Sequence, residues 1–154
     1  MIDKIGFMQG RLSPLVDGKI QAFPWDSWQQ EFPAAQGLGL GLMEWTLDQD
    51  RLYQNPLLTP QGQQEIRRLC QTHRLALPSL TGDCFMQAPL WKARGQDKAA
   101  LETDFIAIAR ACAEVGIEMI VVPLVDHGRL DNEQQEEVLL AFMLAQVDLF
   151  RKLG

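Results

Sequence analysis

Four short apolar runs, each followed by a helix-like stretch, constrain the fold of this chain more than any other feature. The runs cover residues 4–8, 41–45, 75–80 and 118–125. Strands that alternate with amphipathic helices are typical of parallel βα units. In such folds the ligand sites gather where the strands end, at their carboxyl ends. The sequence therefore predicts an α/β fold of four parallel βα units.

The length of the chain limits how much of a barrel it can form. A closed (β/α)₈ barrel needs roughly 250 residues, whereas this chain has 154. A mass of 17.4 kDa with 47% hydrophobic residues suffices for one domain core. We therefore expect residues 1–154 to form a single partial domain, the N-terminal half of a (β/α)₈ TIM barrel, truncated before its fifth strand.

Charge and cysteine content restrict the partners and the compartment. The net charge of −6 and the pI near 4.8 provide no basic surface for nucleic acid. No apolar run approaches the ~20 residues of a membrane helix, and the N-terminus does not resemble a secretory signal. Cys70, Cys84 and Cys112 lack metal-type spacing, which indicates reduced thiols. We expect a soluble cytoplasmic protein without a membrane partner.

The segment after the first predicted strand is rich in residues that interrupt helices and strands, such as glycine and proline. Residues 13–24 contain too many such residues to form a helix or strand, so we expect a long loop there. A long loop after a first strand is often functional. Asp26 or Ser27 is expected to cap the next helix. The glycines over residues 37–41 follow a helix and precede a strand, which favours a helix cap and a tight turn over a phosphate cradle.

Capping signals mark the later helices. Thr59 followed by Pro60 predicts a helix N-terminus, with proline at the first helical position. A strong apolar stripe predicts a helix over residues 97–115. Asp131 or Asn132 is expected to cap one last helix that runs to the end of the chain.

Polar and aromatic residues follow each predicted strand. Aromatic rings stack on the apolar faces of sugars, and carboxylates and amides pair with hydroxyl groups. Together with a tryptophan in the first loop, these residues predict a binding surface for a sugar-like ligand. The candidate substrate-binding residues are Gln9, Arg11, Trp25, Glu44, Asp83 and His127.

Each candidate also has a purely structural interpretation. Glu44 lies on a strand and could instead form a buried ion pair. Asp83 could cap a turn, and Trp25 could simply pack at the start of a helix. His127 could be a metal ligand or a base, or an exposed turn residue beside Gly128. The sequence contains no nucleophile elbow, P-loop, zinc-finger spacing or HExxH motif.

Five short segments stand out for their similarity to known sequences. They are MQGRLSP at residues 8–14, IQAFPW at 20–25, MEW at 43–45, NPLL at 55–58 and PLVD at 123–126. These segments resemble the opening of the sugar phosphate isomerase/epimerase family, the xylose isomerase-like TIM-barrel group. This group also includes ketose 3-epimerases, inosose dehydratases and the endonuclease IV fold. The resemblance covers essentially the whole chain and only the N-terminal half of the family.

The resemblance implies a function for the intact family member. Such a protein would isomerise or epimerise a small sugar or polyol, using a divalent metal (Mn, Mg, Co or Zn) held by Glu, Asp, His and Glu of the later strands. The first of these ligands would end a fifth strand, beyond Gly154. No catalytic residue and no metal ligand is therefore assigned here. We expect the chain alone to be inactive, without a bound metal.

An open half-barrel would leave its first and fourth strands as edges. A homodimer, or association with a complementary C-terminal half, would cover them. The alternative to a sugar isomerase/epimerase-like function is therefore a noncatalytic half-barrel that serves as a binding or assembly module. A DNA-repair nuclease of the same fold fits poorly, because the chain has two histidines and a net charge of −6.

Overall fold

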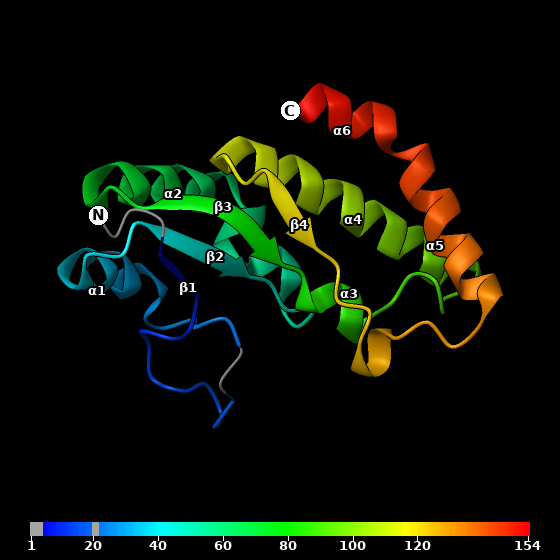
Figure 1. Cartoon of the computed structure of the whole chain (residues 1–154), viewed down its shortest axis with the longest axis horizontal. Coiled ribbons are helices and arrows are strands. Elements are labelled where there is room, and N and C mark those ends of the chain that lie inside the picture. Colours follow the sequence, from blue (N-terminus) through cyan, green and yellow to red (C-terminus); the bar gives the residue numbers. More distant parts are fainter. Residues whose placement is uncertain (1–4, 20–21) are drawn as a thin grey trace.

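The protein forms a four-stranded, all-parallel sheet flanked by helices (Figure 1). The computed structural model describes residues 5–19 and 22–154. The order of the strands in the sheet equals their order in the sequence, β1-β2-β3-β4. This architecture confirms the predicted α/β fold of four parallel βα units. Residue 4 of the first predicted strand, and positions 20 and 21 of the family-like segment, lie outside the described residues.

The elements alternate along the chain as the apolar runs predict. The strands are β1 (Gly6–Met8), β2 (Leu42–Thr46), β3 (Ala76–Thr81) and β4 (Met119–Val121). The α-helices of the described residues are α1 (Glu31–Leu38), α2 (Pro60–His73), α3 (Asp83–Gln87), α4 (Gly95–Val115), α5 (Glu133–Ala145) and α6 (Val147–Leu153). Residues 22–154 also form 3₁₀ turns between these elements: η1 (Trp28–Gln30), η2 (Leu52–Gln54), η3 (Pro56–Leu58) and η4 (Asp126–Gly128).

Most expected helix ends are confirmed. The Thr59 hydroxyl accepts a hydrogen bond from the Gly62 N–H at 3.1 Å and caps α2. Asn132 caps α5 by accepting from the Gln135 N–H. Gly39 ends α1 in the left-handed region, with φ of +73°, which few residues other than glycine adopt easily. The helix-cap interpretation of the glycine series is therefore confirmed.

Other boundaries differ from the prediction. Strand β4 ends at Val121 instead of residue 125, because Pro123 has no N–H to donate to a ladder. The Ser27 side chain makes no capping bond, and the 3₁₀ turn η1 precedes α1. The short helix α3 was not predicted, and the last helix is broken at Gln146 into α5 and α6.

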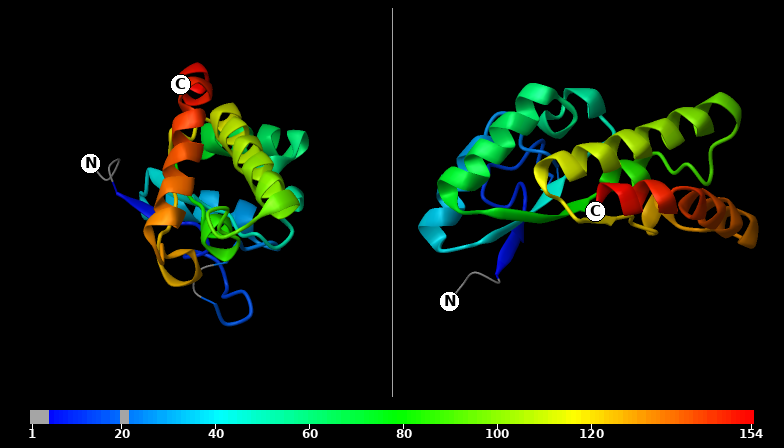
Figure 2. Two further views of the ribbon diagram at one scale, coloured as in Figure 1. Left: turned by 90° about the vertical axis from the view of Figure 1, so that its right-hand side faces the viewer. Right: turned by 90° about the horizontal axis from the view of Figure 1, so that it is seen from above.

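Four of the helices in the described part of the chain pack side by side in sequence order. Helix α1 contacts α2, α2 contacts α4, and α4 contacts α6. Two further views show these helices running alongside the sheet (Figure 2). Buried aromatic residues fill the layer between helices and sheet, with Trp45, Phe23 and Phe32 fully buried. Among the described residues, no helix combines the length and the apolar character needed to cross a bilayer.

Candidate functional site

The carboxyl ends of β1 and β2 are joined by a buried network around Gln9. Its backbone N–H donates to the Glu44 carbonyl at 2.9 Å, and its side-chain Oε1 accepts from the Thr46 N–H at 3.2 Å. The Thr46 hydroxyl donates in turn to the Gln9 carbonyl at 3.2 Å. Gln9 is fully buried, and its side-chain Nε2 has no hydrogen-bond partner in the described part of the chain. One amide donor therefore remains unused at this end of the sheet.

Glu44 lies on β2, and its carboxylate is held by two hydroxyl groups of β3. Ser79 Oγ donates to Glu44 Oε2 at 2.6 Å, and the Thr81 hydroxyl donates to Oε1. Glu44 alternates along β2 with the buried Met43 and Trp45, so it points away from the helices. The carboxylate is half-buried. It is therefore oriented by hydroxyl donors, and no ion pair with a cation of residues 5–19 or 22–154 is formed.

A polar pocket of about 360 Å³ opens between the loops that follow β1 and β2. Its volume lies within the ~300–1,000 Å³ typical of small-molecule sites. The Arg51 guanidinium lies 3.9 Å from the centre of the Trp25 ring, and Phe23 packs edge-on against that ring at 4.8 Å. The pocket thus combines an aromatic wall, a cation and carboxylates. Its principal lining residues are Phe23, Trp25, Asp48, Asp50, Arg51 and Gln87.

Asp48 connects the two loops and the helix that surround this pocket. Its Oδ2 accepts from the Phe23 N–H at 3.0 Å, and its Oδ1 accepts from Gln87 Nε2 at 2.8 Å. Gln87 Oε1 accepts from the Gln49 N–H at 2.7 Å, which closes the network. The loop after β1, the loop after β2 and helix α3 are therefore held in one arrangement.

Asp83 is buried as the first residue of α3. The next residue, Cys84, donates its N–H to the Leu47 carbonyl at 2.9 Å and so fixes α3 against the loop after β2. Burial raises the pKa of the Cys84 thiol, and the negative charges of Asp48 and Asp83 add to this. The thiol is therefore protonated at neutral pH and is not a nucleophile.

The buried Glu31 of α1 holds the loop that carries Arg11. Glu31 Oε1 accepts from the Gly10 N–H at 2.8 Å and from the Leu12 N–H at 3.1 Å. Gly10 has a φ of +92°, a backbone conformation that favours glycine. Burial raises the pKa of the Glu31 carboxyl, although the bonds from Gly10 and Leu12 oppose this rise. The loop conformation thus depends on one buried carboxylate.

The structure gathers some of the predicted site residues and separates others. Gln9 and Glu44 share one network, while Trp25 lines the pocket beside it. Arg11 is exposed, with Nη2 3.9 Å from the sulfur of Met8. His127 is exposed in η4, which packs against α3. Within the described part of the chain, neither Arg11 nor His127 lines the pocket.

Sequence reasoning missed four residues that shape this end of the sheet. Asp48 comes directly after β2 and Leu47, so a strict search of every strand end would have found it. Arg51 lies further along the same loop, and its left-handed backbone (φ of +52°) gave no signal in the sequence. Gln87 and Glu31 act from helices, and only the folded chain brings them to the loops.

The carboxylates of Glu44 and Asp48 are already engaged in hydrogen bonds within the protein. Both carboxylate oxygens of Glu44 accept from hydroxyl groups, and both of Asp48 accept from N–H groups. Over residues 5–19 and 22–154, no three His, Cys, Asp or Glu side chains converge as metal ligands would. We therefore derive no metal-dependent step from these residues.

Comparison with known proteins assigns the chain to no family. No profile of a known protein family matches the chain, and no curated protein sequence matches it.

Proposed function

We propose that this chain binds a small sugar or polyol in the pocket beside Trp25, as the N-terminal half of a (β/α)₈ barrel of the sugar phosphate isomerase/epimerase type. In the intact family member this half would shape the substrate site. Metal-dependent isomerisation or epimerisation would be carried by residues that this chain does not contain. We place the protein in the cytoplasm, an inference supported by its free cysteines Cys70, Cys84 and Cys112.

The observation that carries the proposal is the composition of the pocket at the carboxyl edge of a parallel sheet. Ligands of open α/β sheets bind at this edge. A hydroxyl group both donates and accepts a hydrogen bond, so a polyol needs donors and acceptors side by side. Asp48 and Asp50 supply acceptors, and Arg51 supplies donors. The Trp25 ring, with the Arg51 guanidinium stacked on it, supplies the wall against which a sugar ring can pack.

The same residues explain how binding would be selective. Each oxygen of Asp48 has one hydrogen bond from the protein and a second lone pair for a ligand hydroxyl. The bonds to Phe23 and Gln87 fix the carboxylate before a ligand arrives, which reduces the entropy lost on binding. Glu44 is fixed in the same way by Ser79 and Thr81. The proposed role of this half is therefore positioning and recognition.

Replacing Trp25 with leucine tests the proposal. We expect the dissociation constants for D-fructose and myo-inositol to rise about tenfold, equivalent to ~1.4 kcal/mol, because the aromatic wall is lost. Isothermal titration calorimetry measures the change. The matched control is Tyr53→Leu, which removes an exposed aromatic residue bonded to Asp104 and outside the pocket lining. Equal affinities of Trp25→Leu and the unmodified chain, or no saturable binding by the latter, would contradict the proposal.

A different observation favours the second candidate, a noncatalytic binding or assembly module. Apolar side chains are exposed along β4 and the segment after it, with Met119 57%, Val121 44% and Val125 55% accessible. Exposed apolar surface at a strand edge is typical of an interaction site. This second function is compatible with the first, because the pocket and the β4 edge use different residues.

A further inference from the structure

Both outer strands of the sheet have apolar residues in exposed positions. Strand β1 pairs only with β2, and β4 only with β3, among the described residues. Ile5, just before β1, is 57% exposed, and Met119 on β4 is equally exposed. The ladder continues through Ile5, whose carbonyl accepts from the Gly41 N–H at 3.3 Å. Each edge can therefore accept a further strand.

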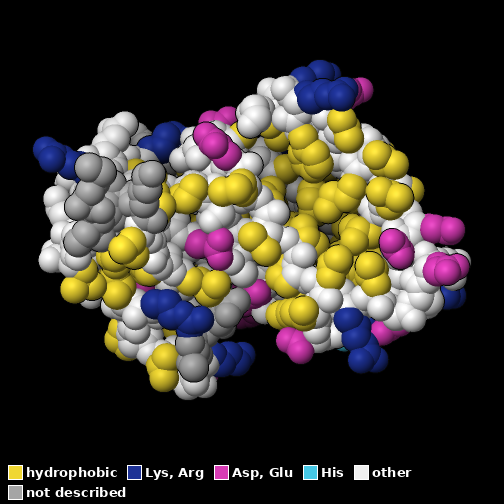
Figure 3. All heavy atoms as spheres, in the orientation of Figure 1, with side chains coloured by type: hydrophobic (Ala, Val, Ile, Leu, Met, Phe, Trp, Pro, Cys, Tyr) yellow, Lys and Arg dark blue, Asp and Glu magenta, His cyan; other side chains and the backbone are white. Residues whose placement is uncertain are grey.

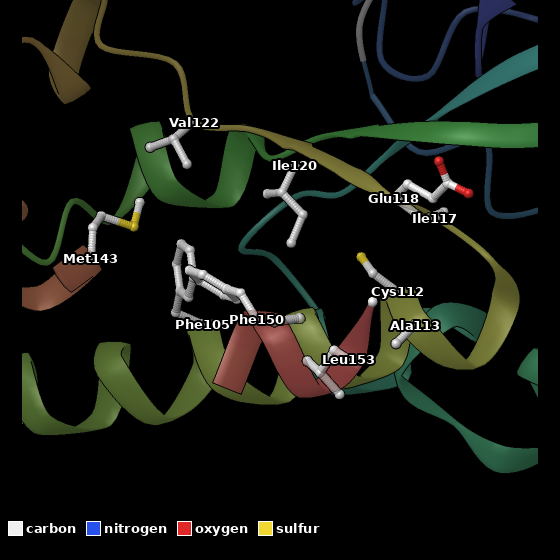
Figure 4. Close-up of a pocket in the computed structure, with 12 residues that line it drawn as sticks. Phe105, Cys112, Ala113, Ile117, Glu118, Ile120, Val122, Met143, Phe150 and Leu153 are labelled. Atoms are coloured by element: carbon white, nitrogen blue, oxygen red, sulfur yellow. The ribbon is translucent and has the colours of Figure 1, made fainter. Parts of the chain in front are cut away.

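A hollow of about 440 Å³ lies between β4, α4 and α6 (Figure 3). Ile120 and Val122 enter it from the β4 side, and the rings of Phe105 and Phe150 lie close together within it (Figure 4). Met143 and Leu153 complete its apolar wall. We call this hollow the β4 groove. Its lining is apolar apart from Glu118 at one end, so it suits aliphatic or aromatic side chains.

The position of α6 explains the groove. The helices contact one another in the order α1, α2, α4, α6, along one layer beside the strands. A helix that follows a parallel strand normally packs over that strand and its next neighbour. No strand lies beside β4 beyond β3 in the described part of the chain. The groove is thus shaped for the outward side chains of one more parallel strand.

We propose that this strand is β1 of a second copy of the chain, in a dimer with twofold symmetry about an axis parallel to the strands. Pairing β4 with the partner's β1 occurs twice in such a dimer and closes eight parallel strands. Neither sheet edge is then left open. Ile5 and Phe7 alternate along β1, so both face the helix layer, where Phe7 packs on the core. In the dimer the exposed Ile5 side chain occupies the partner's β4 groove.

A second copy explains more of the surface than the other arrangements do. Antiparallel pairing of two β4 strands would leave both β1 edges open and Ile5 exposed. An unrelated apolar strand would cover β4 but would not account for the apolar residue exposed beside β1. The parallel dimer also places the strand-end residues of both copies, including Glu44 and Asp48, on one rim. This inference rests on the half-barrel part of the proposed function and does not depend on sugar binding.

Sedimentation velocity over a range of concentrations tests the dimer, with Ile5→Lys as the key variant. Because Ile5 is exposed in the single chain, lysine should leave the fold unchanged. In the dimer it would place a charge in the apolar groove. We expect the unmodified chain to dimerise and Ile5→Lys to raise the dissociation constant by roughly 100-fold or more. Circular dichroism of each variant checks that it is folded.

Two further variants make the test decisive. Leu153→Lys introduces the charge from the groove side and should weaken the dimer as Ile5→Lys does. Leu15→Lys is the matched control at an exposed leucine (59% accessible) in the loop after β1, and it should leave the dimer intact. A monomeric unmodified chain, oligomers that grow beyond two copies, or a dimer that resists Ile5→Lys would each overturn the inference. Sugar binding by a monomer would overturn the dimer and leave the proposed function standing.

Discussion

Replacing Trp45 with alanine is expected to lower the free energy of unfolding by about 3–5 kcal/mol. Trp45 is fully buried on β2. The centre of its ring lies 5.5 Å from the ring centre of Phe23 and 5.7 Å from that of Trp28. The substitution removes the centre of this aromatic cluster and leaves a cavity. Since small domains are stable by only about 5–15 kcal/mol, much of the native stability would be lost. Urea unfolding followed by circular dichroism measures the change.

Two milder variants separate packing from hydrogen bonding. Trp45→Phe keeps most of the ring but loses the bond from Trp45 Nε1 to Asn55 Oδ1, which measures 3.3 Å. We expect it to cost about 1–2 kcal/mol. Trp91→Phe is the matched control, because Trp91 is also buried but its Nε1 has no hydrogen-bond partner among the described residues. It should cost less than Trp45→Phe. A loss below about 1 kcal/mol for Trp45→Ala would contradict the central role of this cluster.

Glu31→Ala is expected to destabilise the protein by about 2–4 kcal/mol, because two N–H donors lose their acceptor. Those donors belong to Gly10 and Leu12, in the loop that follows β1. Glu31→Gln keeps one acceptor oxygen and should cost about half as much. Glu102, a half-buried surface residue paired with Lys98 at 3.3 Å, provides the control, and Glu102→Gln should change stability by less than about 0.5 kcal/mol. Urea unfolding of the three variants tests this order.

The effect of Glu31→Ala should also depend on pH. Burial raises the pKa of Glu31 above its ordinary value of 4.5. The native state therefore binds this proton more tightly than the unfolded state does, and stability falls as the pH rises from about 4.5 through the raised pKa. Glu31→Ala lacks this dependence, so its deficit relative to the unmodified chain should be larger at pH 5 than at pH 8. A deficit that grows with pH would show that burial does not raise this pKa.

The fold was predictable where local chemistry agrees with tertiary packing. The four apolar runs gave four parallel strands, and Thr59, Asn132 and Gly39 mark helix ends by side-chain or backbone chemistry that acts locally. Helix α3 was not predicted, because a contact distant in the sequence stabilises it. The Cys84 N–H donates a hydrogen bond to the Leu47 carbonyl in the loop after β2. Long-range hydrogen bonds of this kind leave no periodic pattern in the sequence.

The site was predictable only in part, for a related reason. Gln9 and Glu44 lie in or beside strand ends, where topology alone brings residues together, and Trp25 lies in the long loop after β1. Glu31 and Gln87 reach the site from helices, through bonds that join residues 21 and 39 positions apart. His127 follows a strand in the sequence, but Pro123 ends the ladder early and η4 presents His127 to solvent. Proximity to a strand end in the sequence is therefore neither necessary nor sufficient for a residue to take part in this site.

Nuclear magnetic resonance of the ¹⁵N-labelled chain, titrated with D-fructose, tests the proposed binding site most directly. We expect saturable shift changes at the backbone amides of Phe23 and Asp48 and at the indole N–H of Trp25, because these groups surround the pocket. Signals from the β4 groove, such as the amides of Phe105 and Phe150, should stay unchanged. No saturable shift at any concentration, or shifts confined to the groove, would contradict the proposal that this pocket binds a sugar or polyol.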